Sequence, residues 1–219
     1  ELRGVLTPYI QRLASVQKIS LDKAYSELKR NYDGYHFSED APGMYNPFSV
    51  LNTLDNLKFG NYWFETGTPS YLVELMQDQD MKLWNITKKL VSSDVLNSVD
   101  IATTEPISVI FQSGYLTIKG YKNEYDGYLL GFPNEEVKRG FLRYLIPRYT
   151  SVRPSDTAFE IESFVEEVRG GDISGFMKRL KSFFANTPYD LIKDTENHYQ
   201  NVLFILCNLC GLYTKAEFH

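Results

Sequence analysis

The sequence feature that most constrains the fold is the stretch from Phe111 to Val137, which combines a helix end, a β-hairpin and a new helix start. Apolar side chains alternate with other side chains in Tyr115–Lys119 and again in Tyr128–Phe132, so each segment offers one apolar face, as a strand does. The polar segment 122–127 between them ends in Asp-Gly, a pair that tolerates the positive φ angles of a reversal. The stretch therefore predicts a β-hairpin.

Helices are predicted on both sides of this hairpin. Pro106 can open the first one, because its missing N–H costs nothing in the first turn, and Gly114 can close it. Asn134 can cap the second, whose first turn holds Glu135 and Glu136, as the helix dipole favours. Helix, hairpin, helix is the outline of a winged-helix-like module. A plain α+β core hairpin without a ligand is the alternative that this outline leaves open.

The rest of the chain is predicted to be mostly helical. Ser20 and Asp172 can each cap a helix, and four pairs of a capping residue and a proline precede apolar-periodic segments: Thr7-Pro8, Asn46-Pro47, Thr68-Pro69 and Thr187-Pro188. The segment 82–86 has the pattern of a short strand, and 150–156 is typical of a linker. The expected fold class is mostly α, in the α+β sense, with a helical bundle part and a small hairpin module.

Composition limits the classes of partner. The net charge of -5 excludes a surface devoted as a whole to nucleic acid or to anionic lipid. A local basic patch is still predicted around the hairpin and its following helix, at Lys119, Lys122, Arg139 and Arg143. The alternative interpretation of this cluster is a solvated helix face. No apolar run reaches the length that spans a bilayer, so we expect no membrane partner and a cytoplasmic location.

The chain lacks the common patterns of catalytic chemistry. It contains neither the G-x-x-x-x-G-K-[ST] phosphate loop nor H-E-x-x-H. Cys207 and Cys210 form C-x-x-C in the last turn of a predicted helix, where the dipole does not lower a thiol pKa, so we interpret them as small buried hydrophobic residues. Asp33 near His36 is typical of an Asx-turn beside an exposed imidazole. We expect no cofactor and no metal site in this chain.

Five motifs, in order, resemble bacterial AAA-ATPase-like proteins fused to a PD-(D/E)XK-superfamily nuclease domain. They are Asp33-Gly34-Tyr35-His36-Phe37; Tyr45-Asn46-Pro47-Phe48-Ser49; Tyr62-Trp63 with Thr66-Gly67-Thr68-Pro69; Gln112 to Ile118; and Phe132-Pro133-Asn134-Glu135-Glu136-Val137. The resemblance implies a P-loop ATPase upstream of this chain, and a nuclease Asp and Glu-x-Lys downstream. ATP and magnesium are then implied for the parent protein, and the missing ATPase and nuclease portions are partners of this segment.

The resemblance also implies a division of the chain. Residues 1–100 would be the C-terminal helical part of the ATPase-like region, 101–153 the winged-helix-like module, and 154–219 a helical linker with the opening helix of a truncated nuclease-like domain. Glu196 or Glu217 would be the helix carboxylate that assists metal binding in such nucleases. These two acids supply part of a catalytic site at most, so we do not expect the segment itself to be an enzyme.

Two functions follow from these expectations. The leading one is a non-catalytic segment that couples ATPase to nuclease and contacts double-stranded DNA through Lys119, Lys122, Arg139 and Arg143. The alternative is a protein–protein interaction scaffold that touches no nucleic acid. In both, the aromatic residues of the motifs are structural, so we expect Tyr35, Phe37, Tyr45 and Trp63 to be largely buried.

Overall fold

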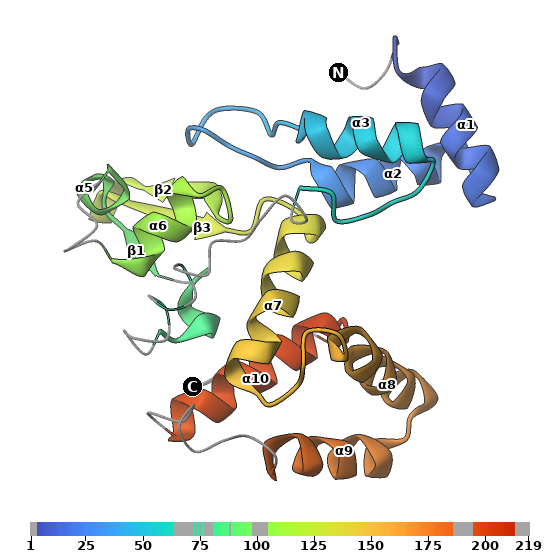
Figure 1. The fold of residues 1–219 in the computed structure, drawn as a ribbon. Coiled ribbons are helices and arrows are strands. Elements are labelled where there is room, and N and C mark those ends of the chain that lie inside the picture. Colours follow the sequence, from blue (N-terminus) through green and yellow to red (C-terminus); the bar gives the residue numbers. More distant parts are fainter. Residues whose placement is uncertain are drawn as a thin grey trace. The chain divides into compact units, whose positions relative to one another are not determined.

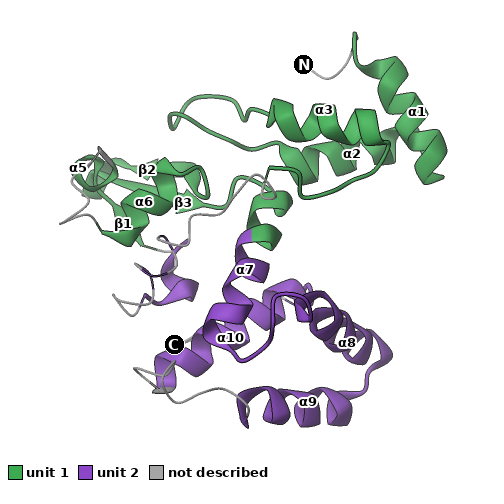
Figure 2. Ribbon diagram, viewed as in Figure 1, with its two compact units in different colours: residues 1–68, 89–140 green, residues 69–88, 141–219 purple. Residues whose placement is uncertain are grey.

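The computed structural model describes residues 4–63, 72, 74, 76, 81–87, 89–97, 105–185 and 195–212 (Figure 1). Within these residues the protein is mostly helical and has one small antiparallel sheet, in agreement with the predicted fold class. The chain forms two units (Figure 2): unit 1 contains residues 1–68 and 89–140, and unit 2 contains residues 69–88 and 141–219. None of the described helices is long and apolar enough to cross a membrane.

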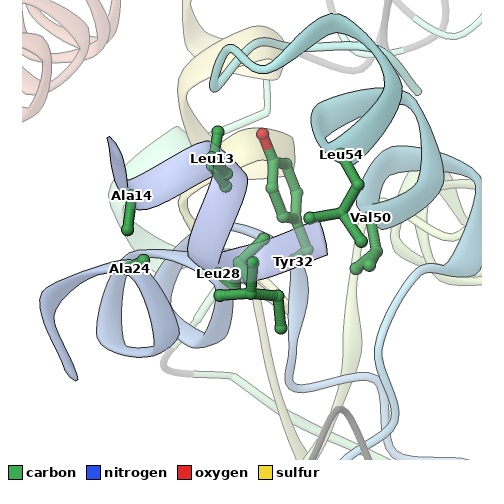
Figure 3. Packing of buried hydrophobic residues seen from close by; sticks show 8 residues of the cluster. Leu13, Ala14, Ala24, Leu28, Tyr32, Val50 and Leu54 are labelled. Atoms are coloured by element: carbon green, nitrogen blue, oxygen red, sulfur yellow. The ribbon is translucent and has the colours of Figure 1, made fainter. Parts of the chain in front are cut away.

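Three helices of unit 1, α1 (Thr7–Gln17), α2 (Leu21–Tyr32) and α3 (Pro47–Asn56), pack around one apolar core. Its buried side chains, most of them labelled in Figure 3, are Ile10, Leu13, Ala14, Ala24, Leu28, Tyr32, Val50 and Leu54. The hydroxyl of Tyr32 is also satisfied, because it donates to Gly60 O at 3.0 Å and accepts from Thr53 Oγ1 at 2.8 Å. Burial of this group raises the pKa of Tyr32.

Side-chain caps start two of these helices as predicted. The Ser20 hydroxyl accepts from the N–H of Lys23 at 3.2 Å, and the Asn46 side chain accepts from the N–H of Ser49 at 3.3 Å. Thr7 behaves differently from the prediction. It lies inside α1, and its hydroxyl accepts from the N–H of Gly4 at 3.2 Å instead of capping the helix.

The predicted hairpin is confirmed as β2 (Thr117–Lys122) and β3 (Gly127–Gly131). Its turn contains a short 3-10 helix, η3 (Asn123–Tyr125), followed by Asp126 with a φ of 44°. The short strand β1 (Leu90–Val91) pairs with β3, which gives the antiparallel order β1-β3-β2. The register of β2 shifts between Ile118 and Gly120, so Lys119 occupies a β-bulge.

Two short helices, α5 (Ser93–Asn97) and α6 (Pro106–Gln112), connect β1 to β2. As predicted, α6 begins at Pro106, and Gly114 follows it with a φ of 79°. The predicted strand at 82–86 is wrong. Leu83–Asn85 form the 3-10 helix η2, because the N–H of Leu83 bonds to the side chain of Asn201 rather than to a neighbouring strand.

Unit 2 is built from the end of α7 (Glu135–Tyr149) together with α8 (Thr157–Gly170), α9 (Ile173–Ala185) and α10 (Thr195–Leu209). Asp172 caps α9 as predicted, since its Oδ1 accepts from the N–H of Gly175 at 2.8 Å. In the core, the Phe164 ring makes edge-to-face contacts with Phe176 and Phe183 at centroid distances of 5.4 and 5.7 Å. The predicted helix starts at Thr68-Pro69 and Thr187-Pro188 lie outside the described residues.

The structure divides the chain into two units, and the three parts that the resemblance implies stay a prediction. The hairpin, expected within a separate module of residues 101–153, belongs to the same unit as α1, α2 and α3. The unit border falls inside α7, after residue 140, and not in the predicted linker at 150–156. Hydrogen bonds between the motifs, described next, account for this grouping.

Candidate functional site

A buried carboxylate, Glu136, joins three segments of unit 1. It lies in the first turn of α7 and is 1% exposed. The Ser49 hydroxyl of α3 donates to it, with its oxygen 2.7 Å from Oε2, and the backbone N–H of Trp63 donates to Oε1 at 2.9 Å. The start of α7 is also capped as predicted, since Asn134 Oδ1 accepts from the N–H of Val137 at 3.0 Å. These bonds fasten the start of α7 to α3 and to the segment at Trp63.

Two tyrosines complete this arrangement. Burial, and then the charge of Glu136, raise the pKa of Tyr35, so its phenol stays neutral beside the carboxylate. The Tyr115 ring meets the Trp63 ring edge-on at a centroid distance of 5.2 Å. We call Tyr35, Ser49, Trp63, Tyr115 and Glu136 the junction. Each of its residues comes from a different one of the five motifs.

The first motif also contacts β2 directly. The backbone N–H of His36 donates to Thr117 Oγ1 at 2.7 Å, and the same hydroxyl donates to His36 O at 2.8 Å. One side chain therefore satisfies both backbone groups of His36. The imidazole was expected to be exposed, but it is half-buried, and its Nδ1 lies 2.8 Å from Ala41 O.

Gly34 allows the first motif to approach the fifth. Its φ is +109°, a conformation that side-chain-bearing residues rarely adopt. A Cβ atom at this position would lie 2.3 Å from Pro133 O. Only glycine fits here, because the added carbon would overlap a backbone carbonyl that cannot rotate out of the way.

Lys119, at the β-bulge, reaches the point where Gly34 approaches Pro133. Its aliphatic stem passes Gly131, where an added Cβ would lie 2.9 Å from Lys119 Cγ. The ammonium then donates to Gly34 O and to Pro133 O, at 3.3 Å each. Burial lowers the pKa of Lys119, and the nearby Asp33 charge opposes part of that effect.

The four predicted nucleic-acid residues therefore have different environments. Lys119 and Lys122 are both exposed, but the Lys119 ammonium donates to two backbone carbonyls, whereas Lys122 lies at the end of β2. Arg139 forms an ion pair with Glu135 one turn earlier in α7, with 3.4 Å between Nε and Oε2. Arg143 is exposed on α7, in the part of the helix that belongs to unit 2. The helix before the hairpin, α6, carries no Lys or Arg.

The predicted nuclease carboxylates are not brought into a site by the described residues. Glu196 is exposed in the first turn of α10, and its Oε1 accepts from Gln200 Nε2 at 3.1 Å. Glu217 lies outside the described residues. Among the residues that the structure describes, no group of three His, Cys, Asp or Glu side chains could hold a metal ion.

The two cysteines are half-buried, Cys207 in the last turn of α10 and Cys210 directly after this helix. Burial raises the pKa of Cys207, and burial together with the charges of Cys207 and Glu167 raises the pKa of Cys210 to about 11. Raised thiol pKa values disfavour the thiolate that redox and metal chemistry require. The environment of the pair is thus that of structural cysteines.

Sequence reasoning missed the role of Asn201. This side chain of α10 is 1% exposed, its Oδ1 accepts from the N–H of Leu83 at 2.8 Å, and its Nδ2 donates to Met81 O at 3.0 Å. The available signal was an amide among the apolar residues that follow it in the helix. Glu136 was expected only to favour the helix dipole, and no sequence pattern distinguished it from Glu135.

The expected burial of the aromatic residues is wrong for Phe37, which is 75% exposed. Tyr35, Tyr45 and Trp63 are half-buried. Phe37 lies just beyond the two His36 hydrogen bonds to Thr117, at the start of the loop that leads to Met44. The chain leaves the surface of β2 at this point, so no contact buries the ring.

A cleft of about 410 Å³ lies in unit 2 between α8 and α9. Its principal charged group is Arg179, whose Nε is 2.7 Å from Glu167 Oε1 and whose Nη1 is 3.6 Å from Glu160 Oε2. Phe164 lies under the guanidinium at 5.8 Å. Lys178 also lines the cleft, so two cations accompany two acids and the cleft does not select a ligand by charge alone.

Comparison with known proteins gives a distant relative. A protein of Azotobacter chroococcum mcd 1, described as "Uncharacterized protein in vnfD 5'region", is 27% identical over 198 residues. The match covers 87% of this chain and 38% of that protein, so the chain spans well under half of its relative. No family model and no solved structure matches the chain.

Proposed function

We propose that this chain is the coupling segment of a bacterial AAA-ATPase-like protein that carries a PD-(D/E)XK nuclease domain. The observation that supports this proposal most is α7: its first turn is fastened in unit 1 by Glu136, and its later residues Phe141 and Leu145 are buried in unit 2. The five motifs that resemble the family supply the five residues of the junction. The segment transmits movement and is not itself catalytic.

The junction is suited to transmit a displacement from α3 to α7, because separating its residues costs free energy. Pulling Ser49 or Trp63 away from Glu136 would leave a buried carboxylate without its donors, at a cost of roughly 1–3 kcal/mol for each lost bond. The start of α7 therefore moves together with α3. Hydrogen bonds along the helix axis then carry the displacement to Phe141 and Leu145. ATP and magnesium act in the parent's other portions.

Hydrogen exchange tests this coupling. We expect Glu136→Gln to speed amide exchange not only at α3 and Trp63 but also at residues 141–149 of unit 2, because a neutral amide loses the charge that strengthens both bonds and the Oε2 acceptor of the shorter Ser49 bond. Exchange is measured by mass spectrometry on the whole chain. Glu135→Gln, one residue earlier and half-buried, is the matched control and should leave exchange at 141–149 unchanged. Effects of Glu136→Gln confined to unit 1 would contradict the coupling.

A second candidate function, contact with double-stranded DNA, is supported by the exposed Lys122 at the hairpin and by the Arg139 side chain, which is 51% exposed. Because the Lys119 ammonium already donates to two backbone carbonyls, we count the other three predicted residues as the phosphate contacts. Three contacts predict a slope of about -2.7 for log affinity against log salt, and Lys122→Ala should remove about 0.9 of it.

Fluorescence anisotropy with a labelled duplex measures this slope. Lys58→Ala, an exposed lysine at the end of α3, is the control for general charge. A folded chain that does not bind the duplex at low salt has no DNA contact, and this result would leave the coupling role untouched.

A further inference from the structure

The tip of the β2–β3 hairpin presents a cluster of aromatic rings. Tyr121 and Tyr128 are paired across the two strands, and their ring centroids are 4.8 Å apart with the planes tilted by 48°. Tyr125, in η3, is 62% exposed. We call Tyr121, Tyr125 and Tyr128, together with the turn 122–126, the hairpin tip.

The hairpin tip is acidic. Glu124 and Asp126 are exposed in the turn, and the Tyr121 hydroxyl donates a hydrogen bond to Asp126. This bond is the largest cause that raises the pKa of Tyr121, to about 12, and the charge of Glu39 contributes to the same shift. The negative charge of Glu39, in the loop before α3, therefore acts on Tyr121. Lys122 is the single cation of the turn 122–126.

These charges decide what the rings can bind. A phosphate backbone would meet three carboxylates against one lysine, whereas a cation would be attracted both by the carboxylates and by the negative faces of the rings. An arginine side chain suits both, because its planar guanidinium stacks on aromatic rings and forms paired hydrogen bonds with a carboxylate.

We propose that the hairpin tip binds an arginine-bearing segment of a partner protein. The guanidinium lies over the tyrosine rings and bonds to Glu124, whose carboxylate, unlike that of Asp126, is not engaged by Tyr121. This inference specifies the partner class of the protein-interaction alternative. The arginine-binding proposal uses no residue of the junction. Either proposal, arginine binding or coupling through α7, can therefore fail while the other holds.

Peptide titration tests the proposal on the whole chain. Three labelled peptides of equal length, rich in arginine, lysine or the neutral analogue citrulline, are followed by anisotropy at low salt. We expect the arginine peptide to bind several times more tightly than the lysine peptide, and the citrulline peptide not to bind. Tyr125→Ala and Glu124→Gln should each weaken the arginine peptide by about two- to five-fold.

Matched variants keep the test specific. Tyr9→Ala removes an equally exposed tyrosine on α1, and Glu166→Gln neutralises an exposed acid on α8, and neither should change the affinity. Equal affinity for the arginine and lysine peptides, or binding that ignores Tyr125→Ala, would overturn the proposal. Binding of a labelled DNA duplex that is tighter than peptide binding and is lost in Lys122→Ala would overturn it as well, and would assign the hairpin tip to nucleic acid.

Discussion

Glu136, Thr117 and Asn201 show how single polar side chains hold this protein together. Each is at least 97% buried, and each satisfies a backbone group of a segment far away in the sequence. Buried polar groups without partners cost free energy, so a side chain that pairs with backbone in this way fixes the position of a loop that has no apolar core of its own. The loop containing Trp63 and the segment at Leu83 are held by such contacts.

We predict that Asn201→Asp lowers the free energy of unfolding by about 2 kcal/mol or more. The carboxylate can still accept from the N–H of Leu83, but it would face Met81 O without a proton to donate. Urea denaturation measures the change. Gln11→Glu, an amide-to-acid change on the exposed side of α1, should alter stability by less than about 0.5 kcal/mol. Equal effects of the two changes would contradict the assigned role of Asn201.

The raised pKa of Cys210 predicts low thiol reactivity. A shift from the ordinary 9.0 to about 11 lowers the thiolate population at pH 8 by about a hundredfold. A Cys207→Ser background removes one smaller cause of the shift but keeps burial, the largest one, so iodoacetamide should still label the native chain far more slowly than the urea-unfolded chain. The rate should rise as pH approaches 11. Native labelling as fast as unfolded labelling would show that Cys210 is not protected.

The same shift has a consequence for stability. A pKa that is raised in the folded state contributes stability that is fully present below the unfolded value of 9.0 and is lost as pH rises through about 11. Burial also raises the pKa of Tyr32. Its contribution to stability is therefore also lost as pH rises above the ordinary tyrosine pKa of 10.0. We therefore expect unfolding to become easier in strong base.

At the scale of the element, the hairpin is fixed at its base by the first and fifth motifs. Lys119 lies at a β-bulge of β2, and its ammonium donates to both Gly34 O and Pro133 O. The tip, by contrast, is exposed and carries the tyrosines and acids described above. A rigid base and an exposed tip are the features of an element that presents a contact surface.

We predict that Gly34→Ala destabilises unit 1 on the order of 3 kcal/mol, because the new Cβ would overlap Pro133 O and the backbone would keep a φ of +109°. Thermal unfolding followed by circular dichroism measures the loss. Gly120→Ala, on the neighbouring strand β2, has nothing within 4 Å of the added carbon and should change stability by less than about 1 kcal/mol. Similar losses for both variants would mean that the approach of Gly34 to Pro133 is not tight.

The elements that the sequence predicted well are those whose signals are local. Ser20, Asn46, Asn134 and Asp172 each cap a helix through a bond to an N–H three residues later, and Asp-Gly closes the hairpin turn. The segment at 82–86 was predicted incorrectly because the decisive bond comes from Asn201, more than a hundred residues away.

The candidate site depends on the same long-range information. The motifs indicated which segments matter, but not that Tyr35, Ser49, Trp63 and Tyr115 surround Glu136. The phosphate contact of Lys119 stays a prediction. Its bonds to Gly34 O and Pro133 O could not be foreseen, because alternation along a strand cannot reveal a bulge, which depends on the register with β3.

At the scale of the whole molecule, the two units share α7. Residues 135–140 belong to unit 1 and residues 141–149 to unit 2. Neither part is long enough to be stable as an isolated helix, since helices shorter than about 12–15 residues are marginal in water. Each unit therefore needs the helix that the other helps to hold.

We predict that the two units unfold together. Trp63 lies in unit 1 and Trp84 in unit 2. Trp63→Phe therefore leaves one tryptophan reporter in unit 2, and Trp84→Phe leaves one in unit 1. Urea titrations of the two variants, each checked by circular dichroism, should give coincident transitions once the stability change of each substitution is taken into account. Two separate transitions, with one reporter responding well before the other, would show that α7 does not couple the units.

The continuity of α7 across the unit border also restricts how the protein can evolve. One residue inserted near position 140 would rotate every later side chain of the helix by about 100°. Phe141 and Leu145 would then turn out of the buried positions that they occupy. An insertion of seven residues, about two turns, would nearly restore their direction. Homologous chains should therefore differ in length here by whole turns or not at all, and recombination that exchanges one unit should succeed only when it preserves the phase of the helix.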